Sequence, residues 1–299
     1  MEAAPNDRIA QAGVELKAII LDRVTGNGHF PTGIPGVFFV RRDMGLATEH
    51  RFDRPLASLI IQGSKKSVIG HDEYLLSAND ALIVCVDMPS SSQLLDASEE
   101  KPFLSIYFHL DPLVIADLVI DLGNAGLHAS RVKGISLARA DADYMEGMLR
   151  LARLVYHPEQ ISLRGPMILR ELHYLLLIGV HGNALRNLHG NHVCGQQIFK
   201  AIEYLRTHLE VNVRSEELAK AVHMSESTLY RNFKILTGLS PLQYHKQLKL
   251  HEARRIMLTE NEQAGMAALK VGYESINQFN REYKRLFGQP PHRSKKHGS

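Results

Sequence analysis

The chain has 299 residues, of which 44% are hydrophobic and 22% are charged. This balance is typical of a folded globular protein, and the length predicts roughly two domains. The longest apolar run, Tyr174 to Val180, is too short to cross a bilayer, and the first residues lack the basic-then-apolar pattern of a secretory signal. These features argue against a membrane-spanning or secreted protein and predict a cytoplasmic one with no membrane partner.

Charge is distributed unevenly between the two ends of the chain. From Ile198 to Ser299 there are 17 Lys+Arg against 10 Asp+Glu, a net of +7, whereas the remainder has 18 against 22, a net of −4. A basic C-terminal third is typical of a nucleic-acid-binding module joined to a second domain. The two cysteines, Cys85 and Cys194, are too few for a disulfide framework. We interpret both as buried apolar groups, and a sensing role for either stays open.

Residues 30–110 carry the pattern of a β-domain. Short runs rich in β-branched and aromatic residues follow one another with Gly, Pro, Asn and Asp between them. Strands in close succession without intervening helices predict an antiparallel sandwich or barrel. The runs are GVFFVRR, LASLIIQG, SKKSVIG, DALIVCV and PFLSIYFHL.

Helical periodicity replaces this pattern after Asp111. Asp111 followed by Pro112 is a typical helix start, and apolar residues at three- and four-residue steps predict helices over 141–156 and 162–180. The second helix has apolar residues on more than one side. It packs either against a second subunit, as in a homodimer, or within the chain's own core.

Residues 183–197 lack periodicity and are rich in Gly and Asn, which predicts a linker. The linker separates a domain of residues 1–182 from an all-helical domain of residues 198–299. Within the latter, Ser215 is the predicted cap of a short helix, and Pro241 opens a long helix that continues to about Leu258.

The C-terminal domain repeats one pattern at a separation of 50 residues. MSESTLYRNFKILTG begins at Met224, and YESINQFNREYKRLFG begins at Tyr273. In each copy a serine caps a helix, an apolar stripe runs along it and a glycine ends it. The matched pairs are Ser225 and Ser275, Leu229 and Phe279, Arg231 and Arg281, Phe233 and Tyr283, Lys234 and Lys284, Leu236 and Leu286, Gly238 and Gly288, and Pro241 and Pro291.

Each repeated helix follows a shorter one, over 215–222 and 264–271, across a tight turn. This is the helix-turn-helix pattern, in which the second helix lies in the major groove of DNA. Arg suits guanine, Asn and Gln suit adenine, and Lys is better placed for phosphate. Opposite the apolar stripes lie Ser227, Tyr230, Arg231 and Lys234 in the first copy, and Asn277, Gln278, Asn280, Arg281 and Lys284 in the second.

The long helix between the copies explains their separation. Eighteen residues from Pro241 to Leu258 form a helix about 27 Å long. Such a helix can hold two recognition helices roughly one DNA turn apart, about 34 Å, an interval that a dimer normally supplies. The sequence therefore predicts a single chain that reads two successive major grooves.

About 100 C-terminal residues, MSESTLYRNFKILTGLSPLQYHKQLKLHEARRIML followed by VGYESINQFNREYKRLFGQPP, resemble the AraC/XylS family of bacterial transcription regulators. The resemblance implies a seven-helix DNA domain with two helix-turn-helix units. It places base contacts at Ser227, Tyr230, Arg231, Ile276, Asn277, Gln278, Asn280 and Arg281. With the capping Ser225 and Ser275 and with Lys234 and Lys284, these residues form the predicted DNA-binding set.

One departure from the family pattern concerns the first helix of the second unit. Ala264 and Ala267, with Gly265 between them, stand where the family usually has two large apolar residues. The departure predicts a thinner core in that unit, with docking that is looser or dependent on DNA.

The N-terminal stretches PTGIPGVFFVRRD, LIIQGSKKSVIGHDEYLL and VDMPSSSQLLDASEEKPFLSIYFHLDP resemble the cupin-like domain of one AraC subgroup. The resemblance implies effector binding, dimerisation or both. The predicted fold is α+β, with a cupin-like antiparallel β-barrel and trailing helices followed by an all-α double helix-turn-helix domain. The predicted function is effector-responsive, sequence-specific regulation of transcription. Its predicted partners are double-stranded DNA, RNA polymerase and a small molecule that the sequence does not identify.

The sequence offers two alternative functions, a metal-dependent cupin enzyme and an architectural DNA-binding protein. A metal-dependent cupin enzyme needs converging histidines, usually with two of them one residue apart. His29, His50, His71 and His109 form no such pair, so we predict no metal, no cofactor and no catalytic residue. An architectural DNA-binding protein relies on phosphate contacts and DNA bending, and the Asn-, Gln- and Arg-rich face of the second copy argues against it.

Overall fold

The computed structural model describes residues 4–44, 48–123, 133–189 and 193–294. The chain divides into two compact units, an N-terminal one of residues 1–49 and 53–192 and a helical one of residues 193–299 together with 50–52. Within the described residues, no helix combines the length and the apolar character that a membrane span requires.

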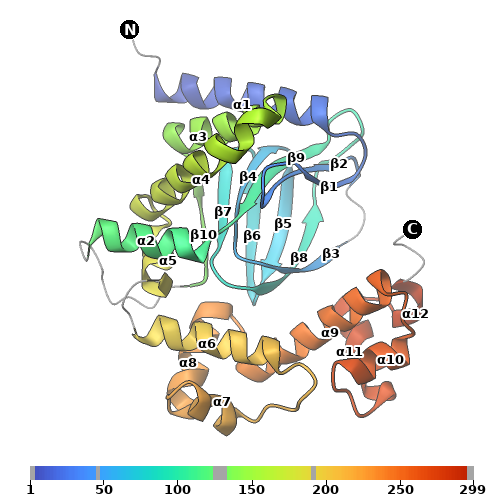
Figure 1. Ribbon diagram of the computed structural model, residues 1–299. Coiled ribbons are helices and arrows are strands. Elements are labelled where there is room, and N and C mark those ends of the chain that lie inside the picture. The colour runs from blue at the N-terminus through green and yellow to red at the C-terminus, as the bar shows by residue number, and fades with distance from the viewer. Residues whose placement is uncertain (1–3, 45–47, 124–132, 190–192, 295–299) are drawn as a thin grey trace. The chain divides into compact units, whose positions relative to one another are not determined.

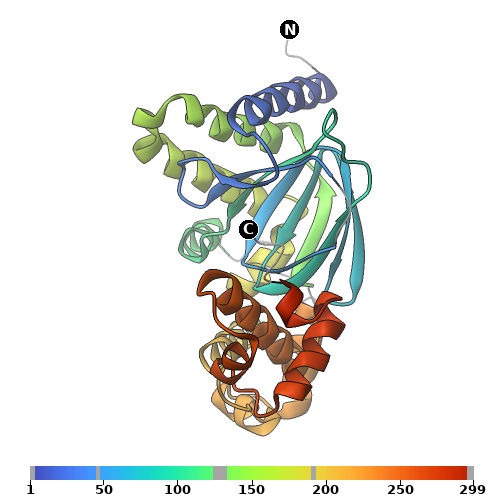
Figure 2. The same ribbon diagram turned by 90° about the vertical axis from the view of Figure 1, so that its right-hand side faces the viewer.

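Two antiparallel sheets form the centre of the N-terminal unit (Figures 1 and 2). The strand orders are β1-β2-β9-β4-β7-β10 and β3-β8-β5-β6. The first sheet contains β1 (Gly28–Pro31), β2 (Val37–Arg42), β9 (Phe103–His109), β4 (Leu56–Gln62), β7 (Asp80–Val84) and β10 (Ile135–Arg139). The second contains β3 (Glu49–Asp53), β8 (Met88–Leu94), β5 (Ser64–Ile69) and β6 (Asp72–Ser77). The predicted antiparallel β-domain is confirmed, although the described strands pair as two sheets and not as one continuous ring.

Helices pack against the larger sheet and against one another. They are α1 (Pro5–Arg23), α2 (Pro112–Leu122), α3 (Ala142–Arg153), α4 (Ile161–Ile178) and α5 (Gly182–His189). Asp111 caps α2 as expected, by accepting hydrogen bonds from two backbone N–H groups of its first turn. His173 of α4 packs edge-on against Phe108 of β9, with 5.2 Å between the ring centroids. These contacts fix the trailing helices on the sheet.

The N-terminal unit contains one helix that the sequence analysis did not predict, and a second in the predicted linker. Helix α1 was not predicted, although it begins at Pro5 and buries four residues at helical spacing from Ala12 to Ile20. Part of the predicted linker is also helical, because α5 occupies Gly182–His189 and α6 begins at Val193. The glycines and asparagines of this stretch suggested a loop, but Ala184, Leu185 and Leu188 are buried and hold α5 in place.

Cys85 is buried, which agrees with its interpretation as an apolar group. Burial raises the pKa of its thiol to about 12, so the reactive thiolate is scarce at neutral pH. The side chain of Cys194 lies outside the described residues.

The helical unit contains seven helices among the residues described (Figure 1). They are α6 (Val193–Thr207), α7 (Ser215–Ala221), α8 (Glu226–Thr237), α9 (Pro241–Thr259), α10 (Ala264–Lys270), α11 (Ile276–Phe287) and α12 (Pro291–Ser294). The long helix expected from Pro241 to Leu258 therefore extends one residue further. Helices α7 and α8 form the first helix-turn-helix unit, α10 and α11 form the second, and α9 joins them.

Candidate nucleic-acid interface

The two turns between paired helices have nearly the same backbone. In the first turn, the N–H of His223 bonds to the carbonyl of Lys220; in the second, the N–H of Gly272 bonds to the carbonyl of Leu269. His223 and Gly272 both adopt positive φ, 56° and 75°. The second turn is one residue longer, because Glu274 precedes the serine cap.

Caps and stops of the two recognition helices match as the repeat predicts. Ser225 accepts a hydrogen bond from the N–H of Thr228, and Ser275 accepts one from the N–H of Gln278, each at 3.3 Å. Gly238 and Gly288 end the helices in the left-handed conformation, with φ of 73° and 74°. Helices α8 and α11 therefore have the same length, 12 residues each.

Helix α7 begins differently from the expectation. Ser215 is its first helical residue and not its cap, because Arg214 occupies the N-cap position. The Glu217 side chain accepts a hydrogen bond from the Arg214 N–H at 3.3 Å. The N-terminus of this helix is thus closed by a carboxylate from within the first turn, a role that a search for serine caps does not detect.

The apolar faces of both recognition helices are buried. Leu229, Phe233 and Leu236 of α8 are at most 7% exposed. In α11, Phe279 and Tyr283 are fully buried, but Phe287 takes the place expected for Leu286, which packs only partly against the core. Phe279, Tyr283 and Phe287 of α11 share one buried cluster with the small Ala267, and Ala264 packs partly against it. The looser or DNA-dependent docking predicted for this unit stays a prediction.

All twelve residues of the predicted DNA-binding set are exposed on α8, on α11 or at their caps. Arg231, Lys234, Arg281 and Lys284 make no hydrogen bond or ion pair with any residue that the structure describes, so their charges are available to a partner. Tyr230 and Ile276 are 52% and 46% exposed despite their apolar surface. The side chains that the repeat assigned to base reading thus share an exposed face on each helix, and their contact with DNA remains a prediction.

A partly buried polar network behind α11 was not predicted. Glu282 accepts hydrogen bonds from Lys246 and from the Tyr273 hydroxyl, each at 2.8 Å, and from the Gln278 amide at 3.3 Å. Burial favours a higher pKa for Glu282, but these hydrogen bonds outweigh it and hold that pKa below its ordinary value. From the sequence, Glu282 is one more polar residue beside the apolar stripe, and no local pattern identifies its partner on α9.

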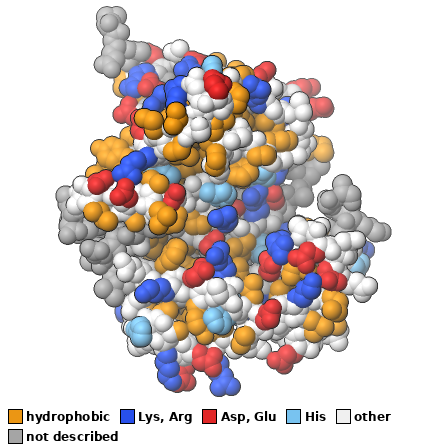
Figure 3. Space-filling model, viewed as in Figure 1, with side chains coloured by type: hydrophobic (Ala, Val, Ile, Leu, Met, Phe, Trp, Pro, Cys, Tyr) orange, Lys and Arg blue, Asp and Glu red, His pale blue; other side chains and the backbone are white. Residues whose placement is uncertain are grey.

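Charge on the visible face of the helical unit is mixed. Figure 3 shows Lys and Arg side chains interspersed with Asp and Glu over the part of the molecule that contains α6 to α12. The net charge of this region therefore does not appear as one uniform basic patch on that face. Contact with DNA depends on where individual cations lie.

The N-terminal unit has its own cluster of rings, formed by His29, Phe38, Tyr107 and His109 on strands β1, β2 and β9. Phe38 stacks on Tyr107 with 5.1 Å between centroids, and both histidines lie edge-on within 5.7 Å of Tyr107. Among the described residues, no group of three His, Cys, Asp or Glu side chains is placed to hold a metal ion.

Comparison with known families agrees with both halves of this architecture. The profile of the AraC-type transcriptional regulator N-terminus matches residues 33–184, which is half of the chain. A helix-turn-helix domain profile matches residues 218–297. The fold and the paired helices define a DNA-binding transcription regulator. The chain belongs to the AraC/XylS family of transcriptional regulators.

Curated relatives match over only part of the chain. The HTH-type transcriptional activator RhaS of Escherichia fergusonii is 29% identical over 123 residues, 41% of this chain and 44% of the relative. The bifunctional transcriptional activator/DNA repair enzyme AdaA of Bacillus subtilis is 29% identical over 91 residues, 30% of this chain and 43% of the relative. The matches thus span less than half the length of these relatives.

A solved structure with similarity over most of the chain is that of apo ToxT from Vibrio cholerae, in a form with one lysine replaced by alanine. It covers 92% of this chain and 100% of its own, with a TM-score of 0.58 and 11% sequence identity. Wild-type ToxT bound to an unsaturated fatty acid covers 90% of this chain and 95% of its own, with a TM-score of 0.52 and 10% identity. At this identity the likeness concerns the fold alone.

Proposed function

We propose that the chain reads a specific operator by placing α8 and α11 in successive major grooves, and that a small molecule bound to the N-terminal unit controls its contact with RNA polymerase. The observation that carries the proposal is the pair of recognition helices with the same length, serine caps and glycine stops. The exposed faces of the two helices carry different side chains on the same backbone arrangement. A single chain therefore offers two base-reading surfaces of different sequence preference.

Single arginine substitutions in the intact chain test this directly. A site is first selected from a random DNA pool, and Arg231→Ala and Arg281→Ala are then measured on it. Each is expected to cost about 1–3 kcal/mol and to relax preference at one base pair, a different one for each variant. Arg206→Ala is the matched control, because Arg206 lies on α6 and pairs with Glu203. If both arginine variants bind as tightly as Arg206→Ala, the recognition faces are assigned wrongly.

The size of the footprint provides a second test. Helix α9 has 19 residues, so its axis is about 28 Å long. We expect protection of two major-groove segments about one helical turn apart on one face of the duplex. Lys234→Ala should weaken binding to all sequences alike and reduce the salt dependence, because an exposed lysine neutralises phosphate. Protection of a single groove would exclude simultaneous reading by both helices.

The ring cluster of β1, β2 and β9 supports a small-molecule site in the N-terminal unit. Stacked and edge-on rings offer apolar faces, and the histidines add hydrogen-bonding edges. The fatty acid bound to ToxT suggests the first compound class to try. An unsaturated fatty acid should raise the midpoint of thermal unfolding of the wild-type chain but not of Phe38→Ala. Equal shifts for both proteins would place the ligand elsewhere.

We also propose that two copies of this chain pair through α2 and α4. Leu163, Met167 and Ile178 are 75%, 71% and 49% exposed along one side of α4, and Leu113 and Ile120 of α2 are 79% and 78% exposed. Such a concentration of exposed apolar side chains on two packed helices is typical of an interface. Met167→Asp should convert a dimer into a monomer in sedimentation equilibrium. A wild-type chain that is monomeric at high concentration would contradict this part of the proposal.

A further inference from the structure

A pocket of about 310 Å³ lies where the first half of α9, the segment between α6 and α7, and the turn of the second helix-turn-helix unit meet. Its floor is the first half of α9, which contributes Leu242, His245, Lys246 and Lys249. One wall is the stretch of Asn212 and Val213 ahead of α7. The other wall is the Gly272–Glu274 turn together with Gln278 of α11. The pocket therefore touches the second reading unit, the segment that leads into α7 and the helix that joins the two units.

The walls of this pocket are held at a fixed separation. A Cβ added to Gly272 would lie 2.1 Å from the Glu210 carbonyl oxygen, so the backbone of this turn approaches the segment between α6 and α7 as closely as glycine permits. Asn212 donates a hydrogen bond to Glu274 across the same boundary at 3.2 Å. Because these contacts join the segment ahead of α7 directly to the turn of the second unit, the pocket is part of a continuous surface and not a gap between independent bodies.

Lys249 is the unusual residue of the pocket. It is only 6% exposed, and it makes no hydrogen bond or ion pair with any residue that the structure describes. The neighbouring cation, Lys246, is already neutralised by Glu282 at 2.8 Å. Burial lowers the pKa of Lys249, and the more distant charge of Glu274 only partly opposes this. Glu274 also lines the pocket but forms no ion pair with Lys249, so the Lys249 ammonium has no paired anion there, which is costly for a charge held largely away from water.

The position of the pocket indicates where that anion comes from. Gln278 belongs both to its wall and to the predicted base-reading face of α11, so the pocket opens beside that face. When two recognition helices occupy adjacent major grooves, the DNA backbone between the grooves passes over the helix that joins them. The first half of α9 is that position. His245, the other buried polar residue of the floor, donates to the His208 carbonyl and adds no negative charge.

We propose that this pocket receives one backbone phosphate of the operator, between the two base-reading contacts, and that Lys249 is its buried cation. The inference rests on the proposed function and identifies one contact between the chain and its operator. A phosphate at this point carries no base identity, but it fixes the register of both recognition helices on the duplex. The chemistry recognised is a phosphodiester anion, and a free phosphate ion is the competing source of the same charge.

Neutral phosphate substitution tests the assignment. Each phosphate of the selected operator is replaced in turn by an uncharged methylphosphonate, and affinity is measured for the intact wild type and for Lys249→Met. For wild type, we expect about a tenfold loss at one central phosphate on one strand, the size of a single strong charge contact. Lys249→Met should bind the unmodified site about tenfold more weakly, with a salt slope lower by about one, and should lose nothing further at that phosphate. Lys234→Ala is the control and should keep the central sensitivity.

The possible outcomes separate this inference from the proposed function. If wild type selects no sequence at all, the proposed function fails first. If wild type binds a selected site but Lys249→Met keeps its affinity and shows the same methylphosphonate profile, only the pocket assignment fails. Unfolding of Lys249→Met is measured in parallel and should be no earlier than that of wild type, since a buried charge is replaced by an apolar chain of similar length.

A third arm distinguishes the sources of phosphate. The DNA-free chain is unfolded thermally in sodium phosphate and in sodium chloride at matched ionic strength. We expect equal midpoints for wild type, because the phosphate in question is presented by the duplex. A selective stabilisation by phosphate that Lys249→Met abolishes, together with a flat methylphosphonate profile, would assign the pocket to free phosphate and overturn the DNA assignment.

Discussion

The two helix-turn-helix units share caps, stops and helix lengths but differ in how they are held to the rest of the helical unit. The first has a two-residue turn with His223 at positive φ, and its recognition helix is fixed through apolar side chains such as Phe233, which packs edge-on against Tyr244 of α9. The second has a longer turn with Gly272 in the equivalent conformation, and a partly buried carboxylate, Glu282, ties its recognition helix to α9. The comparison shows that one reading surface can be supported mainly by apolar packing, and the other by packing together with a partly buried carboxylate that bonds to α9.

The largest expected effect comes from the turn. Gly272→Ala places a Cβ against the Glu210 carbonyl at positive φ, so we expect a loss of about 2–5 kcal/mol in the free energy of unfolding, from strain and overpacking together. The matched change in the first unit, His223→Gly, should stay within about 1 kcal/mol of wild type, because His223 is exposed and already adopts this conformation. Denaturant unfolding measures both. Similar losses would mean that the two turns are equally constrained.

The buried His245 of α9 predicts that the free energy of unfolding depends on pH. Burial lowers its pKa to about 4, with the nearby charges of Lys249 and His208 acting in the same direction and the bond to the His208 carbonyl opposing them. In the unfolded chain His245 binds a proton near pH 6.5, and in the folded chain only near pH 4. The contribution of neutral His245 to the free energy of unfolding is therefore complete above pH 6.5 and is lost as the pH falls from 6.5 to 4. The loss approaches about 1.4 kcal/mol per pH unit, or about 3 kcal/mol in all.

Comparison of wild type with His245→Gln isolates this contribution, since the amide can still donate to the His208 carbonyl. The difference in unfolding free energy between the two proteins should change with pH between 6.5 and 4 and be constant above 7. His181 of the N-terminal unit, whose pKa burial also lowers to about 4, is present in both proteins and cancels. A difference that does not vary with pH would show that His245 is not buried in its neutral form.

Glu282→Gln tests the polar network of the second unit. The amide keeps a partner for the Tyr273 hydroxyl but loses the charge that pairs with Lys246, so we expect about 1–2 kcal/mol of destabilisation. Because Gln278 also bonds to Glu282, base preference should relax in the half-site read by α11 and not in the half-site read by α8. Glu226→Gln on α8 is the control, an exposed carboxylate without a hydrogen-bonded partner among the described residues. Relaxation in both half-sites would mean that the network orients the whole helical unit.

The differences between the two helix-turn-helix units also show which features the sequence could predict. Caps, stops and apolar stripes depend on neighbours within a few residues, so the two copies and the exposed positions of the predicted set could be located from spacing, except Ile276, which the family resemblance supplied. The contact of Gly272 with Glu210 and the hydrogen bond of Lys246 to Glu282 join residues far apart in the chain, and one sequence contains no record of such pairings. Lys249 has the pattern of an exposed helical lysine, and only the folded arrangement shows that it is buried.

In the N-terminal unit, too, the sequence predicted features that depend on near neighbours and missed one that depends on burial. The strand runs were predictable because each is short, apolar and bounded by turn residues. Helix α5 was missed because Gly182 and Asn187 lower helix propensity, and burial of Leu185 outweighs that preference. The main division between the two units, after residue 192, falls inside the predicted linker.

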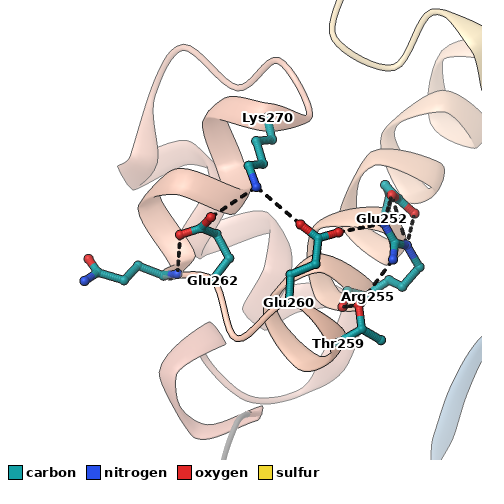
Figure 4. Close-up of polar contacts among 7 residues, drawn as sticks. Glu252, Arg255, Thr259, Glu260, Glu262 and Lys270 are labelled. Atoms are coloured by element: carbon teal, nitrogen blue, oxygen red, sulfur yellow. Dashed lines mark hydrogen bonds and ion pairs between the residues drawn. The ribbon is translucent and has the colours of Figure 1, made fainter.

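The smallest expected effect concerns surface ion pairs at the two short helices. Lys220 of α7 pairs with Glu216, one turn away, and both side chains are largely exposed. Lys270 of α10 bonds to both Glu260 and Glu262, and Glu260 also pairs with Arg255, which in turn pairs with Glu252 (Figure 4).

Lys220→Ala should cost about 0.3 kcal/mol, the usual worth of an exposed pair one turn apart. Lys270→Ala should lower the unfolding midpoint further, because one ammonium group holds the C-terminal end of α9 and the start of α10 together. The gap between the two variants should close in 1 M salt, which screens both sites, and a gap that persists there would trace the effect to packing of the lysine stem rather than to charge.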